Sequence, residues 1–162
     1  MKKACFTLLV SLIACNSNST IDKVIKEHDQ TDFSIFKNKY IHFRSVGQTR
    51  ATSIYFVGVD SVDCSPYGVE VNNANDSVIS INNKLVISSC GKDYMTNENI
   101  TQITKEYLKY NFALIKVDNY GNVFINPDKL NEEPNVLRHV PSTMPLHFNS
   151  FKHYSGNWYL RN

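Results

Sequence analysis

The chain has 162 residues, of which 42% are hydrophobic, 12% aromatic and 20% charged. This length suits one globular domain and is too short for two of ordinary size. Six glycines, five prolines and no detectable repeat exclude collagen-like, solenoid and low-complexity chains. Without Lys2 and Lys3, which lie in a segment that we expect to be removed, 15 basic residues balance 15 acidic ones. Such a neutral chain argues against nucleic-acid binding, which depends on a concentrated basic surface.

The first fifteen residues have the pattern of an export signal. Lys2 and Lys3 precede an apolar run at 4–14. This run is too short to span a bilayer as a helix, which needs roughly 20 residues. It ends in Leu12-Ile13-Ala14-Cys15, which resembles the lipobox of bacterial lipoproteins.

The resemblance implies that the Cys15 thiol receives a diacylglycerol, that residues 1–14 are cleaved off, and that the lipid holds the protein on a membrane. Several acyl chains would anchor it firmly, since each buried methylene contributes about 0.8 kcal/mol. Asn16 stands where an aspartate resembles an inner-membrane retention signal. We therefore expect a location in the bacterial cell envelope, at the outer membrane.

Two other interpretations of the N-terminus stay open. Cys15 could be incidental to an ordinary cleaved signal, although Leu12 is large where such peptidases prefer a small residue. The chain could instead be a secreted eukaryotic protein, glycosylated at Asn18, Asn75 or Asn99, each of which begins an Asn-x-Ser/Thr triplet.

The rest of the chain is organised as one domain behind a tether. Residues 15–20 are polar after the cysteine and predict a flexible tether, which leaves 21–162 as a single globular domain. Apolar residues at helical spacing predict a short helix at 20–28. Aromatic and β-branched runs predict strands at 32–46 (one or two strands), 52–62, 69–72, 78–81, 84–89, 113–117, 123–126 and 158–160.

The strongest helix signal lies at about 97–111. Thr96 or Asn97 caps its start, and Ile100, Ile103 and Tyr107 line one face. Prolines between 127 and 145 predict an irregular surface loop. The fold class is therefore α+β, a mainly antiparallel sheet with one principal helix and a short N-terminal helix.

Two cysteines, Cys64 and Cys90, remain in the exported domain. In an oxidising envelope such a pair favours a disulfide. The predicted meander at 69–72, 78–81 and 84–89, however, places them at opposite ends of the sheet, whereas bridged Cα atoms lie within about 7 Å. The sequence leaves the bridge undecided.

Candidate catalytic groups lack a recognised pattern. His139, His147 and His153 cluster in sequence, but their spacing suits a metal site on neither a helix nor a strand. Asp60 with Asp63, or Glu132 with Glu133, offer carboxylate pairs of unknown separation. The segment 118–122 has the composition of a calcium loop but predicts a hairpin turn. We expect no cofactor and no metal.

Aromatic residues are concentrated near the C-terminus. They are Phe148, Phe151, Tyr154, Trp158 and Tyr159. Such side chains either form the centre of an interface with a protein or glycan, or close the core against the sheet. The second use is the more common one.

These observations predict a lipid-anchored envelope protein that acts as a binding module. Its partner would be an envelope protein, a toxin or lytic enzyme that it inhibits or neutralises, or a glycan. The alternative is a small periplasmic hydrolase that uses carboxylates or the region of His139, His147 and His153.

Overall fold

The structure is a computed structural model that describes residues 16–127 and 133–162. The chain divides into two compact units, Met1–Gln30 and Thr31–Asn162. In the first unit the described element is helix α1, Asn16–His28. It begins earlier than the predicted helix at 20–28 and includes residues 16–20, which were predicted as part of the tether. Asn, Ser and Thr are favoured at helix starts, so this polar segment can begin a helix. Cys15 and the predicted signal lie outside the described residues.

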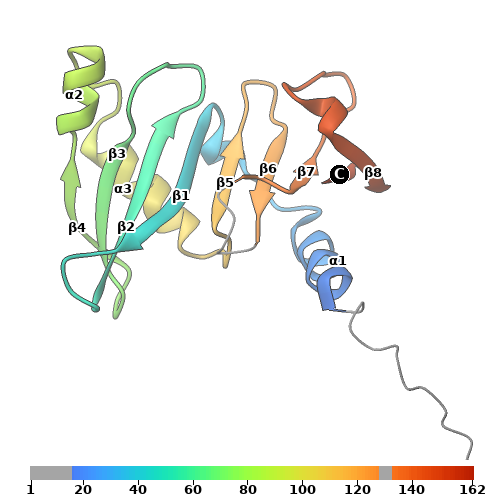
Figure 1. The fold of residues 1–162 in the computed structure, drawn as a ribbon, viewed down its shortest axis with the longest axis horizontal. Helices are drawn as coiled ribbons and strands as arrows, with labels where there is room; N and C mark the ends of the chain where they lie inside the picture. Colours follow the sequence, from blue (N-terminus) through green and yellow to red (C-terminus); the bar gives the residue numbers. More distant parts are fainter. Residues whose placement is uncertain (1–15, 128–132) are drawn as a thin grey trace, which may run out of the picture. The chain divides into compact units, whose positions relative to one another are not determined.

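The second unit is built on one sheet, in which nine strands of the described residues pair antiparallel (Figure 1). The order is β4-β3-β2-β1-β5-β6-β7-β9-β8. The strands are β1 (Lys39–Val46), β2 (Thr52–Val59), β3 (Tyr67–Asn72), β4 (Ser77–Asn82), β5 (Leu114–Val117), β6 (Val123–Asn126), β7 (Val136–Arg138), β8 (Phe151–Ser155) and β9 (Trp158–Arg161). From the centre of the sheet, β1, β2, β3 and β4 follow one another toward one edge. On the other side, β5, β6, β7, β9 and β8 follow one another toward the opposite edge.

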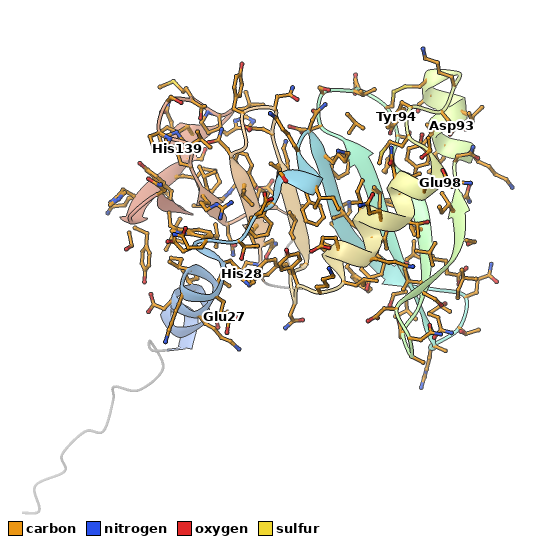
Figure 2. The ribbon with its side chains drawn as sticks, turned by 180° about the vertical axis from the view of Figure 1, so that it is seen from behind. Glu27, His28, Asp93, Tyr94, Glu98 and His139 are labelled. Carbon is orange, nitrogen blue, oxygen red and sulfur yellow. A yellow bond between two sulfur atoms is a disulfide. The ribbon has the colours of Figure 1, made fainter. Side chains whose placement is uncertain are left out.

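Helix α3, Asn97–Tyr107, returns the chain from the β4 edge to β5 at the centre. The Thr96 hydroxyl accepts a hydrogen bond from the Asn99 amide and caps the helix, as predicted. The helix ends before the predicted 111, because the Lys109 amide bonds to the Glu106 carbonyl and the Tyr110 amide to the Tyr107 carbonyl, which tightens the last turn. Figures 1 and 2, seen from opposite sides, show α3 lying across one face of the sheet.

The main core lies between α3 and this face. Tyr107 on the helix makes an edge contact with Tyr55 on β2, with ring centres 5.6 Å apart. The buried apolar side chains of the neighbouring strands include Ile41, Val57, Val69, Ile115, Ile125, Val136 and Trp158. Trp158 is only 1% exposed and belongs to the core, which is the more common of the two uses expected for the C-terminal aromatic residues.

The segment predicted as a strand at 84–89 is instead a helix, α2, Lys84–Cys90. The Asn82 side chain accepts a hydrogen bond from the Lys84 amide at its start, and Gly91, at φ 71°, ends it. Val86 and Cys90 are four residues apart and therefore share one face of this helix. A strand here would instead have continued the predicted meander.

The helix brings Cys90 to Cys64. The structure joins them in a disulfide, with Cα atoms 5.8 Å apart. The predicted geometric obstacle depended on a strand at 84–89, and it disappears because a helix occupies that segment.

The fold is therefore more strand-rich than one principal helix implies. The described residues contain α1, α2 and α3 with two short 3-10 helices, Ser34–Phe36 and Phe148–Ser150. Strands β7 and β8 were not predicted. β7 has three residues, too few for a periodic signal, and β8 is exposed at four of its five positions.

The face of the sheet opposite α3 carries a row of side chains from successive strands. The paired positions are Tyr40, Lys116, Phe124, Leu137 and Tyr159. We call this side the open face, and it is turned toward the viewer in Figure 1.

Candidate binding site on the open face

A pocket of about 490 Å³ lies on the open face over β5, β6, β8 and β9. We call it the open-face pocket. Residues from several separate segments line it, namely Asp60, Lys116, Asp118, Phe124, Glu133, Pro134, Leu146, His147, Ser150, Phe151 and Arg161.

Two phenylalanine rings and two cations form a compact group in this pocket. The rings of Phe124 and Phe151 are 6.0 Å apart in an edge contact, and both side chains are buried. Lys116 Nζ lies 5.8 Å from the centre of the Phe124 ring, and Arg161 Cζ lies 5.3 Å from the centre of the Phe151 ring. Cation–π attraction therefore holds each cation over an apolar floor.

Each cation also pairs with a carboxylate. Lys116 Nζ lies 2.5 Å from Asp60 Oδ1, and Arg161 Nη1 lies 2.6 Å from Glu133 Oε2. Arg161 Nε donates to the Pro134 carbonyl oxygen at 2.8 Å, which fixes the guanidinium. The Glu133 side chain is 70% exposed. An ion pair with so exposed a carboxylate contributes little to stability.

Tyr40 lies on the same face beside the Lys116–Asp60 pair. Burial, and after it the charge of Asp60, raise the pKa of Tyr40. Its hydroxyl therefore stays protonated at neutral pH.

One side of the open-face pocket is bounded by residues 140–147, which we call the rim loop. Asn122, fully buried in the β5–β6 hairpin, holds this loop. Its Oδ1 accepts hydrogen bonds from the Val140 amide at 2.7 Å and the Thr143 hydroxyl at 3.0 Å. Its Nδ2 donates to Asp118 Oδ2 at 2.8 Å, so both ends of the amide are engaged.

The rim loop presents two apolar side chains to solvent. Met144 is 81% exposed and Leu146 is 77% exposed, the highest values among the large hydrophobic residues that the structure describes. Contiguous exposed apolar surface marks interaction sites, so these two side chains on one loop make the rim loop a candidate contact surface.

Of the three candidate histidines, His139 and His153 lie against one tyrosine ring, and His147 lies in the open-face pocket. His139 and His153 each contact the Tyr159 ring, with ring centres 5.5 and 5.3 Å apart. The ring nitrogens of His139 and His153 bond to backbone oxygens of other residues. His147 lines the open-face pocket. Across 16–127 and 133–162, no group of three or more His, Cys, Asp or Glu could hold a metal.

Two other acidic side chains, Asp93 and Glu98, lie away from the end of the sheet that carries His139 (Figure 2). In Figure 2, His139 is at one end of the sheet, and Asp93 and Glu98 are at the other. The sequence suggested Asp60 with Asp63, and Glu132 with Glu133, as carboxylate pairs. In the structure Asp60 instead pairs with Lys116, and Glu133 pairs with Arg161. Asp60 and Glu133 both line the open-face pocket, each paired with a cation, and Glu132 lies outside the described residues.

The predicted aromatic group divides between two environments. Phe151 lines the open-face pocket, and the half-buried Phe148 and Tyr159 pack against the cluster of Phe124, Leu137 and Phe151. Tyr154 lies at a bulge of β8 and is exposed, whereas Trp158 is in the core.

Sequence reasoning missed Lys116, Phe124 and the rim loop as parts of the site. Lys116 and Phe124 look like ordinary strand residues, and only the β5–β6 register places them side by side. The one available signal was Met144 and Leu146, two large apolar residues inside a proline-rich polar segment.

Comparisons of the chain with protein-family models, curated proteins and solved structures found no match. Among the described residues, no helix is both long enough and apolar enough to cross a membrane.

Proposed function

We propose that the protein is a lipoprotein of the bacterial cell envelope, anchored through Cys15 at the outer membrane, whose folded domain binds a protein partner. The proposed interface is the open-face pocket together with the rim loop. The observation that carries the binding role is the exposure of Met144 and Leu146 on a loop fixed by Asn122. The lipid anchor rests on the lipobox resemblance of residues 12–15.

Rigidity of the rim loop supports recognition. Ordering a flexible loop on binding costs free energy, and a loop already held by hydrogen bonds avoids part of that cost. Thr143 contributes twice, because its hydroxyl bonds to Asn122 and its carbonyl oxygen to His139. The apolar pair would therefore enter an interface in its final conformation.

The pocket beside the loop indicates the partner's chemistry. Arg161 is a guanidinium held in place by the Pro134 carbonyl, with an exchangeable carboxylate, Glu133, on its outer side. A partner segment that carries an acidic side chain next to apolar ones would fit, with its carboxylate on Arg161 and its apolar groups against Leu146. An inhibitor or immunity-type role suits such a protein interface.

The anchor is tested by the intact mass of the protein purified from membranes of bacteria that make it with its own signal. We expect a chain that begins at an acylated Cys15. Reduction should add the mass of two hydrogens, from the Cys64–Cys90 bridge. An unlipidated chain, or one that retains Met1, would contradict the anchor.

The interface is tested by variants that leave the fold intact. Leu146→Asp places a charge on an exposed position and should reduce a stoichiometric cross-linked complex at least tenfold, since buried apolar anchors dominate binding energy. Tyr120→Asp is the matched control, because Tyr120 is 67% exposed on the β5–β6 hairpin. Equal loss in both variants, or in neither, would contradict the proposed interface.

A further inference from the structure

A second pocket, of about 290 Å³, lies on the α3 side of the sheet. We call it the aromatic pocket. It is lined by Phe43, Ser53, Tyr55, Tyr107, Leu108, Tyr110, Asn111, Phe112 and Ala113. These residues come from β1, β2, the end of α3 and the segment that leads into β5, and none of them lines the open-face pocket.

Aromatic rings form most of the wall. The ring of Tyr55 meets Phe43 at 76° and Tyr107 at 71°, with centres 5.8 and 5.6 Å apart. Tyr110 and Phe112 stack in parallel, with centres 5.8 Å apart. The wall of the pocket is therefore mainly aromatic, and an aromatic surface of this kind attracts an organic cation.

The two pockets differ in what their rings already contact. In the open-face pocket, Lys116 and Arg161 lie over Phe124 and Phe151. The lining of the aromatic pocket contains no Lys, Arg or His. For Phe43, Tyr55 and Tyr107, the described residues supply no cation–π partner.

The end of α3 adds a negative field. Tyr107 and Leu108 form the C-terminal end of this helix and line the aromatic pocket, so the negative end of the helix dipole is at its wall. Burial raises the pKa of both Tyr55 and Tyr107, and the Tyr107 hydroxyl donates to the Phe112 carbonyl oxygen. Both hydroxyls therefore stay protonated at physiological pH, and the bond to Phe112 fixes the orientation of the Tyr107 ring.

We propose that the aromatic pocket is a binding site for a quaternary or alkylated ammonium group. Such a group is weakly hydrated and has an apolar surface, so it can leave water for an aromatic wall. Its positive charge is favoured by the aromatic rings and by the C-terminal end of α3. This site is independent of the protein interface proposed above.

The test uses the full chain, observed by NMR, titrated with choline and separately with its neutral carbon analogue 3,3-dimethyl-1-butanol. Choline should shift the resonances of Ser53, Tyr55 and Ala113, and should bind about tenfold more tightly than the neutral analogue. Equal binding of the two would show an apolar cavity without cation selectivity, and would overturn the proposal. Absence of any choline-dependent shift at these residues would overturn it as well.

Variants separate the ring from its hydroxyl. Tyr55→Leu should weaken choline binding about tenfold, while Tyr55→Phe, which keeps a π face, should stay within about threefold of the wild type. Tyr120→Leu, on the exposed hairpin, should have no effect. If Tyr55→Leu fails to fold, the comparison of choline with its neutral analogue on the unaltered chain still decides. Phosphocholine, tested in the same way, distinguishes a phosphate-ester headgroup from free choline as the source of the ammonium.

Discussion

The guanidinium of Arg161 is held over the ring of Phe151, with Cζ 5.3 Å from the ring centre, while its Nε donates to the Pro134 carbonyl oxygen at 2.8 Å. Arg161→Met keeps an apolar stem over the ring but removes the hydrogen bond and the charge. We expect a loss of about 1–3 kcal/mol in the free energy of unfolding, measured by urea denaturation.

The matched change is Glu133→Gln, at the carboxylate that forms an ion pair with Arg161. Because Glu133 is 70% exposed, it should cost less than about 1 kcal/mol. A larger loss from Glu133→Gln than from Arg161→Met would contradict the assignment of Arg161 as the fixed element of the open-face pocket.

Asn122 connects the β5–β6 hairpin to the rim loop. Asn122→Asp removes the donor to Asp118 and places two carboxylates side by side in a buried position, so the free energy of unfolding should fall by roughly 1–3 kcal/mol or more. Limited proteolysis should then cut the rim loop faster. Asn119→Asp, an exposed change in the same turn, should stay within about 0.5 kcal/mol of the wild type. Similar losses in the two variants would remove the special role of Asn122.

Gly58 on β2 is opposite Tyr40 on β1, and a Cβ at position 58 would overlap the Tyr40 ring. Gly58→Ala should therefore destabilise the protein by about 1–3 kcal/mol, as expected for overpacking. Gly68→Ala on β3 is the control, since the nearest atom to its new Cβ would be at 3.8 Å, an ordinary contact. In the Tyr40→Ala background the cost of Gly58→Ala should shrink, and a full cost there would show that the clash is not with Tyr40.

The half-buried Tyr94 predicts sensitivity to alkali. Burial, with smaller effects from Tyr40 and Tyr67, raises the pKa of Tyr94 to about 12, against about 10 for an unfolded tyrosine. Between these values the folded chain keeps a proton that the unfolded chain has lost, so stability should be complete below about pH 10 and fall as pH rises toward about 12. Tyr94→Phe should make this fall shallower in denaturation curves measured across the window. An unchanged slope would contradict the role of Tyr94.

The strands with strong apolar runs could be predicted from the sequence, because their signals are local. β2, β3, β4, β5, β6 and β9 lie where β-branched and aromatic residues predicted them, and Thr96 caps α3 as expected. Residues 84–89 show the limit of such reasoning. Their run of Leu85, Val86 and Ile87 fits a strand or one helical turn. The hydrogen bond from the Lys84 amide to the Asn82 side chain and the left-handed Gly91 at the end favour the helix.

The candidate site could be predicted only in part. The sequence drew attention to Phe151 and to the region around His147, both of which line the open-face pocket. It could not bring Asp60 to Lys116, or Glu133 to Arg161, because these pairs depend on strand order in space. The sequence left Trp158 open between core and interface, because strand alternation decides which face a side chain occupies and the register was not known from the sequence.

The most direct test of the proposed binding role is site-specific photo-cross-linking in cells that make the protein. A photoreactive side chain at Leu146, on the rim loop, should give a cross-linked species of one defined mass, and the same group at Tyr120 on the β5–β6 hairpin should not. Addition of Arg161→Met to the Leu146 probe should reduce that species at least severalfold. A Leu146 probe that gives no discrete species, or the same species as the Tyr120 probe, would contradict binding through the rim loop and the open-face pocket.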